Sequence, residues 1–275
     1  MCLPGTIETV REHEPAVTRR TVLAGSGAAA LAALLPGEAL AHKPKRRRRR
    51  GKVVDLTHTF VAGFPVYTGA SPVRRTIKNF VPDGFYSQEW TFGEHSGTHL
   101  DVPGHFVEGG RLTPQLRPRE LVLPIVVIDI SKRARRNPDA EVTPDDLRRF
   151  ERRHGRIPKR ALVAMNSGWA DKLGTPEFTG ADASGVYHFP GFGEDAIDVL
   201  LDQRRAAAIA VDTISLDHGP STTFAVHVKW LGADNYGIEG IANLDRIPAH
   251  GATAVVGVIP WEQGSGGPAR VLATY

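Results

Sequence analysis

The chain has 275 residues, of which 41% are hydrophobic and 23% are charged, and this balance excludes a disordered or fibrous protein. Its net charge of +4 comes from residues 42–52, which hold eight basic side chains and no acidic one, whereas the residues that follow contain more acids than bases. That distribution argues against a broad basic face, and we expect no nucleic-acid partner. The only cysteine is Cys2, so any metal site further along the chain depends on His, Asp and Glu.

Residues 1–41 are predicted to be a twin-arginine export signal. Paired arginines at 19–20 precede a weakly hydrophobic stretch, Val22–Leu35, which is shorter than the ~20 residues of a membrane-spanning helix. Pro36-Gly37 breaks that stretch, and Ala39-Leu40-Ala41 fits a small-residue cleavage site. We therefore expect export by the twin-arginine route to the periplasm or the outside of the cell. The alternative is an N-terminal helix that stays attached.

The basic segment over residues 42–52 is predicted to be a solvated, disordered arm, because its like charges repel and it has no apolar face to bury. As a simple spacer it would have no ligand. Alternatively it would make weak contact with anionic envelope polymers or lipid head groups. It lacks the interleaved aromatic residues that stack on bases.

Residues 53–275 are predicted to form one α/β domain. Several runs are continuously apolar and β-branched, as in strands that are covered on both faces. The expected strands are Val53–Thr57, Ser87–Phe92, Val122–Ile130, Ala161–Asn166, Ala207–Asp212, Thr253–Ile259 and Val271–Tyr275. The expected helices are one that starts after the capping residue Thr143 and stops at Gly155, one over Gly193–Arg205, and a shorter one over Ala225–Gly232.

Three histidines and one aspartate fall within eleven positions, at His95, His99, Asp101 and His105. We expect this segment to continue the strand over Gln88–Phe92, in which case positions 95, 99 and 101 point to one side. At ~3.3 Å per residue, positions 99 and 101 are about 6.6 Å apart and can share an ion, whereas 95 and 99 are about 13 Å apart. The chain must therefore curl between His95 and His99, and Gly97 can take the required backbone angles.

Two imidazoles and one carboxylate form a ligand set that suits Zn²⁺, Mn²⁺ or Fe²⁺. Three protein ligands also leave coordination positions open, which is typical of catalytic rather than structural metal sites. The alternative is that the clustered histidines are surface residues or hydrogen-bonded core residues.

The twelve residues from His95 to Phe106 resemble the HxGTHxDxPxHF signature of the cyclase family, which includes bacterial kynurenine formamidases and isatin hydrolases. Further segments that resemble the family are Asp55–His58, Asn166–Trp169 and Val211–Asp217. The resemblance implies a swivelling β/β/α domain and a homo-oligomer, either a dimer or a tetramer.

The resemblance also implies a site. His95, His99 and Asp101 would bind a divalent transition metal, Zn²⁺ or Mn²⁺. His227 and Glu239, twelve positions apart, would complete a site for one or two ions. The remaining histidine of the motif, His105, would act as general acid and base.

Four further residues are candidates for supporting roles. Asp212 and Ser215 could support the metal-binding imidazoles through hydrogen bonds, and Tyr67 and Trp169 could line a pocket for an aryl group. The alternative for each is ordinary structural hydrogen bonding or core packing.

The predicted function is hydrolysis of a carbon–nitrogen bond in an amide, formamide or cyclic amide, with a small aromatic substrate. One alternative is ester or lactone hydrolysis, or a cyclisation, on the same fold. The other is a metal-binding envelope protein without turnover, which would have no need of His105 as a proton carrier.

Overall fold

The strands around the site form a sheet that closes on itself. The computed structural model describes residues 51–275, so the predicted export signal and residues 42–50 of the predicted basic arm lie outside the described residues. The strand order is β1 (Val53–Asp55), β12 (Gly266–Thr274), β11 (Ala252–Val258), β5 (Val122–Asp129), β7 (Leu162–Asn166), β9 (Ala208–Val211), β10 (Tyr236–Glu239) and β4 (His99–Asp101). Because β4 pairs with β12 as well as with β10, the sheet forms a ring, with β1 outside it.

Within this ring, β5, β7, β9 and β10 are parallel, whereas β4, β11 and β12 run antiparallel to their neighbours. Successive side chains of a strand point to opposite faces. One alternating set comes from every strand of the ring and packs into a single buried cluster in its interior. Members of this interior cluster are Leu100, Ile125, Ala164, Ala210, Ile238, Val256 and Val271.

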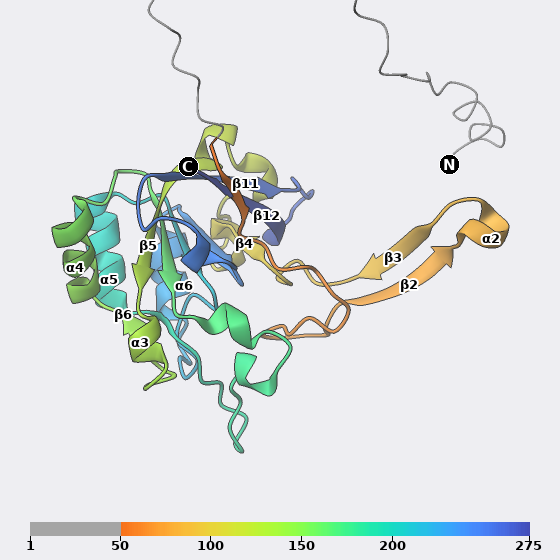
Figure 1. Ribbon diagram of the computed structural model, residues 1–275, viewed down its shortest axis with the longest axis horizontal. Coiled ribbons are helices and arrows are strands. Elements are labelled where there is room, and N and C mark those ends of the chain that lie inside the picture. The colour runs from red at the N-terminus through yellow and green to blue at the C-terminus, as the bar shows by residue number, and fades with distance from the viewer. Residues whose placement is uncertain (1–50) are drawn as a thin grey trace, which may run out of the picture. The chain divides into compact units, whose positions relative to one another are not determined.

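Helices cover the outer face of the parallel strands (Figure 1). They are α4 (Pro144–His154), α5 (Glu194–Asp198) and α6 (Ala225–Gly232), with the short helix α3 (Ser131–Ala134) and the strand pair β6 (Glu141–Val142) and β8 (Gly191–Phe192) beside them. Outward-facing Met165 and Val211 pack here with Leu147, Ile197 and Trp230. The buried α/β layer agrees with the prediction that the longer apolar strands are covered on both faces.

The predicted helices form with one difference. α4 begins after Thr143, whose hydroxyl accepts a hydrogen bond from the backbone N–H of Asp146, and it ends at Gly155. α6 has the predicted bounds. The predicted helix over Gly193–Arg205 divides into α5 and a π-helical turn over Val199–Arg204. Across residues 51–275, no helix has both the length and the apolar character that crossing a bilayer would require.

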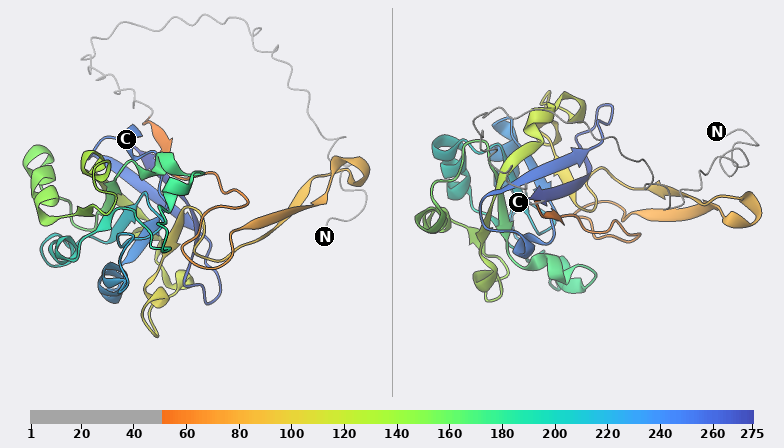
Figure 2. Two further views of the ribbon diagram at one scale, coloured as in Figure 1. Left: turned by 90° about the horizontal axis from the view of Figure 1, so that it is seen from below. Right: turned by 45° about the horizontal axis from the view of Figure 1, so that its top comes forward.

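The expectation that the strand over Gln88–Phe92 runs on into the histidine–aspartate segment is wrong. β3 (Ser87–Thr91) instead pairs with β2 (Val73–Lys78) in a separate two-stranded sheet. This hairpin, with the short helix α2 (Phe80–Asp83) at its tip, projects away from the ring (Figures 1 and 2). β2 was not predicted, because its sequence VRRTIK is largely polar and all six of its residues are exposed.

Candidate metal centre

The two middle residues of the motif lie on one strand. In β4, Leu100 points into the ring and is fully buried in the interior cluster. His99 and Asp101 therefore point outward, and the Nε2 atom of His99 lies 3.4 Å from the Oδ1 atom of Asp101. The predicted convergence of these two side chains is confirmed. Both are at least 95% buried, with exposed fractions of 5% and 1%.

A curl in the chain brings His95 to the same place. Gly97 has a φ of 73°, in the left-handed region that glycine adopts without strain. The next residue, Thr98, donates its hydroxyl hydrogen bond to the carbonyl of Gly240 at 2.5 Å and so fixes the start of β4. His95 then lies with its Nδ1 atom 2.7 Å from Asp101 Oδ1. The predicted curl at Gly97 is confirmed.

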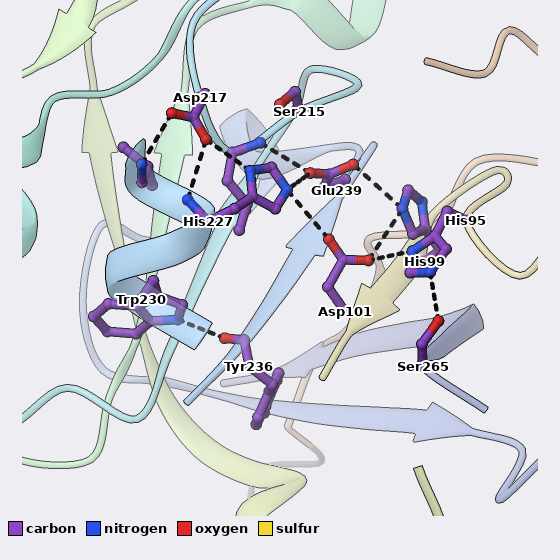
Figure 3. A network of polar contacts seen from close by, with 12 residues as sticks. His95, His99, Asp101, Ser215, Asp217, His227, Trp230, Tyr236, Glu239 and Ser265 are labelled. Carbon is purple, nitrogen blue, oxygen red and sulfur yellow. Dashed lines mark hydrogen bonds and ion pairs between the residues drawn. The ribbon is translucent and has the colours of Figure 1, made fainter. Parts of the chain in front are cut away.

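Residues from two other elements complete the cluster (Figure 3). Glu239 ends β10 and is paired in register with His99 of β4. His227 lies on α6, and its Nε2 atom is 3.0 Å from Glu239 Oε1 and 3.5 Å from Asp101 Oδ2. The structure therefore brings together all five predicted ligands, although they are separated by as many as 144 positions (239 − 95).

This donor set fits a divalent metal ion. The atoms form two groups, one of His95, His99 and Asp101 and one of Asp101, His227 and Glu239, and within each group the donor atoms lie within 4.8 Å of one another. His99 Nε2 and Asp101 Oδ2 are buried and have no hydrogen-bond partner within the described residues. Because a buried polar atom without a partner is costly, both atoms are suited to coordinate an ion.

The charges of the buried imidazoles and carboxylates also favour a bound cation. Burial alone would lower the pKa of His99, but the negative charges of Asp101 and Glu239, whose oxygens lie 3.4 and 3.2 Å from its Nε2 atom, raise it to about 9. For the carboxylate of Glu239 the directions are reversed. Burial and the charge of Asp101 would raise its pKa, but His227 and His99 lower the pKa below its usual value. Two ionised carboxylates are thus buried side by side and require positive charge beside them, either imidazolium or a metal ion.

Hydrogen bonds orient two of the imidazoles. His99 Nδ1 lies 3.0 Å from the carbonyl oxygen of Gly97, which can only accept, so this nitrogen carries a proton. His227 Nδ1 lies 2.6 Å from the carboxylate of Asp217. In both rings Nε2 therefore faces the cluster, and a metal ion that binds there displaces the proton from this nitrogen.

The role of Asp217 was not predicted. Its carboxylate also accepts hydrogen bonds from the backbone N–H groups of Val226 and His227, in the first turn of α6. It thus fixes both the helix and the ring that the helix carries. The residue lay within a segment that resembles the family, but its position ten residues before His227 matches no capping pattern, so no local signal indicated the contact.

His105 lies apart from both donor groups. It ends a short 3-10 turn over Pro103–His105, and its ring stacks on that of His95 with centroids 3.7 Å apart. Burial lowers the pKa of His105, while the charge of Asp101 opposes the shift. A lowered pKa keeps the ring neutral and able to accept a proton at neutral pH.

A cavity of about 230 Å³ opens onto this cluster. The donors His95, His99, His227 and Glu239 line it together with His105. Four aromatic residues line it as well, and Phe106 stacks on His227 with centroids 4.7 Å apart; the four are Phe64, Tyr67, Phe106 and Phe224. Ser215 lines the same cavity, and its hydroxyl oxygen has no hydrogen-bond partner within residues 51–275. The structure thus places two of the four predicted supporting residues, Tyr67 and Ser215, at the cavity.

The other two supporting residues lie elsewhere. The carboxylate of Asp212 accepts hydrogen bonds from Ser167 and from the backbone N–H of Trp169, and its hydrogen bonds in the described part of the chain reach no metal-site imidazole. Asp217 makes the contact that was expected of Asp212. Trp169 is 2% exposed, packs with Phe178 in a buried cluster and does not line the cavity. Neither residue therefore lies where its expected role would place it, because both follow the ends of the neighbouring strands β7 and β9 and bond to each other there.

Comparison with known proteins identifies similar chains. Residues 54–218 match the family model described as "Putative cyclase". The chain is 35% identical over 209 residues to an isatin hydrolase from Roseibium aggregatum. The aligned region covers 72% of this chain and 78% of the relative.

Solved structures agree with this match. Isatin hydrolase A from Ralstonia solanacearum superposes with a TM-score of 0.78 at 33% identity, across 82% of this chain and 92% of that chain. An isatin hydrolase bound to the product analogue thioisatinate superposes with a TM-score of 0.77 at 30% identity, and the match covers 82% of this chain and 93% of that chain. The predicted α/β fold of the swivelling type is therefore confirmed.

The curl at Gly97 gives a first prediction. A Cβ atom at this position would lie 2.5 Å from the Phe60 ring and would impose strain at a φ of 73°. We expect Gly97→Ala to displace His95 and to weaken Zn²⁺ binding at least tenfold, as measured by competition with a chelator. The matched control is Gly93→Ala, because nothing lies within 4 Å of a Cβ there. Equal affinities in the two variants would contradict the role of the curl.

Proposed function

The chain belongs to the cyclase family, and from that membership and the site we propose that it is a metal-dependent amidohydrolase. It hydrolyses a carbon–nitrogen bond other than a peptide bond, in an amide, formamide or cyclic amide. The observation that carries this proposal is the position of His105, which lines the same cavity as the donor atoms and stacks on His95 without joining either donor group. A purely structural metal site has no use for such a residue.

The two donor groups support one or two ions, with Asp101 shared between them. Nitrogen and carboxylate donors without a thiolate suit Zn²⁺ or Mn²⁺. When bound, such an ion acts as a Lewis acid on a carbonyl oxygen and makes water a nucleophile at neutral pH. The protein supplies the orientation, because Gly97 and Asp217 fix the rings of His99 and His227 before any ion binds.

His105 moves the proton. As a neutral base it accepts a proton from the attacking water while the new carbon–oxygen bond forms. It then returns that proton to the departing nitrogen as the carbon–nitrogen bond breaks, so the ring ends the cycle neutral. Stacking on His95 holds the ring of His105 in place between these two transfers.

The cavity favours a small aromatic substrate. Tyr67, Phe106 and Phe224 meet edge to face or tilted, with centroids 5.4 to 5.6 Å apart. Phe224 has a φ of 50°, a backbone conformation that is costly for a residue with a large side chain. It precedes α6 in a position where Ser, Thr, Asp, Asn or Gly would normally cap the helix. The phenylalanine at this position places an aromatic ring in the lining of the cavity.

The experiment that tests this function compares substrates and variants. We expect the purified enzyme to hydrolyse N-formyl aryl amines or isatin-like lactams. His105→Ala should lower kcat by about 10² to 10⁴ while metal content stays at the wild-type level. His154→Ala, which changes an exposed histidine outside the cavity, serves as the matched control.

Three outcomes would contradict the proposal. Activity on aryl esters alone would replace the amidohydrolase by an esterase or lactonase of the same fold. Loss of metal in His105→Ala would make that residue a ligand. Metal binding without turnover of any of these substrates would favour the alternative function, a metal-binding envelope protein without catalysis.

We also propose that the protein is a homo-oligomer that assembles through its projecting hairpin, residues 73–91. A two-stranded hairpin is marginally stable in water by itself. This hairpin exposes apolar side chains at its tip, with Phe80 72% and Val81 86% exposed. Contiguous exposed apolar surface of this kind favours a protein partner, here a second copy of the chain.

Replacing the tip residues tests the assembly. The double variant Phe80→Ser, Val81→Asp should shift the molar mass measured by light scattering toward the monomer. Val186→Asp, at an exposed apolar residue outside the hairpin, should leave it unchanged. A monomeric wild-type protein would contradict the proposal.

Finally, we propose that the chain is exported by the twin-arginine route and acts in the periplasm or outside the cell, where its basic arm would make weak contact with anionic envelope components. The sequence of residues 1–52 supports this proposal. Replacing both Arg19 and Arg20 with Lys should retain the protein in the cytoplasm, as followed by fractionation. Unchanged export of that variant would contradict the route.

A further inference from the structure

The ring of His95 is oriented differently from those of the other two candidate ligands. His99 and His227 use Nδ1 for orienting hydrogen bonds and direct Nε2 at the cluster. In His95 it is Nδ1 that lies 2.7 Å from Asp101, whereas Nε2 points away from the cluster and lies 3.0 Å from the hydroxyl of Ser265 (Figure 3). The three rings therefore cannot all present the same nitrogen to an ion.

The partner of Ser265 decides which nitrogen of His95 carries a proton. The hydroxyl of Ser265 donates to the carboxylate of Glu94 at 2.7 Å, and the backbone N–H of Ser265 donates to the same oxygen at 2.9 Å. A serine hydroxyl has one proton, so toward His95 its oxygen is an acceptor. The Nε2 atom of His95 must then donate, and Nδ1 is the nitrogen that is left to bind a metal ion.

The backbone around Ser265 is built for this contact. Ser265 lies between Gly264 and Gly266 at the start of β12. A Cβ atom at Gly266 would lie 2.6 Å from Cε1 and 3.1 Å from Nδ1 of His95. The missing side chain thus leaves the space that the imidazole fills. A Cβ atom at Gly264 would lie 3.3 Å from the carboxylate of Glu94.

We propose that Glu94 and Ser265 are positioning residues that set the tautomer of His95, so that this ligand binds the metal through Nδ1 while His99 and His227 bind through Nε2. The inference rests on the proposed metal site and assigns a role to two residues outside the donor set. Hydrogen bonds of this kind to metal-bound imidazoles typically change metal affinity by 10- to 100-fold when they are removed.

The experiment uses Zn²⁺, which is diamagnetic, and the metal-free full chain. Binding is measured by chelator competition for wild type, Ser265→Ala and Glu94→Met. The histidine tautomers are read from ¹⁵N-labelled imidazoles by NMR with Zn²⁺ bound. We expect a 10- to 100-fold loss of affinity in both variants, and in the wild type a metal-bound Nδ1 for His95 alone. Ser265→Thr, which keeps the hydroxyl, should restore the affinity.

Glu262→Met is the matched control, because it makes the same chemical change at an exposed residue of the same loop. If Ser265→Ala fails to fold, Glu94→Met, which keeps the length of the side chain and removes the acceptor oxygen, tests the same contact. Unchanged affinity in Glu94→Met, or coordination of His95 through Nε2, would overturn the proposal. A wild-type protein that binds no Zn²⁺ or Mn²⁺ would instead overturn the metal site itself, so the two failures are distinguishable.

Discussion

The double pairing of β4 is the constraint on which the site depends. This three-residue strand is hydrogen-bonded to β10 on one edge and to β12 on the other, which closes the sheet. A slip of one residue would turn Leu100 out of the ring and His99 and Asp101 into it. Since burying Leu100 is favourable and burying an aspartate among aliphatic side chains is not, the apolar core holds these two candidate ligands in register.

The same pairing explains why each strand neighbour contributes to the site. β10 sets Glu239 directly opposite His99, and β12 begins beside Ser265, which contacts His95. α6 then covers the outer face and adds His227. Three imidazoles and two carboxylates thus meet where rigid elements join, and each ring that is a candidate ligand has a second hydrogen bond that limits its rotation.

Charged and aromatic side chains both line the cavity. The buried carboxylates of Asp101 and Glu239 favour a cation beside the imidazoles. The aromatic residues pack against these imidazoles, as Phe106 does on His227 with centroids 4.7 Å apart, and they offer a small planar group an apolar surface. His105 lines the same cavity, with burial lowering its pKa, and this position suits a group that exchanges protons with both water and substrate.

Local pattern and fixed intervals in the sequence were enough to predict the family motif, the strands and helices of the core and, with the help of the family spacing, the five candidate ligands. Even the need for a curl at Gly97 followed from the length of an extended chain. The polar strand β2 and the tight pairing of β4 left no periodic signal, so the path of β3 was predicted wrongly. Only the tertiary structure could assign Asp217 in place of Asp212, move Trp169 into the core and bring Glu94 and Ser265 to His95. Those contacts join residues from separate elements, and a hydrogen bond that spans 170 positions depends on how the sheet closes rather than on any local preference.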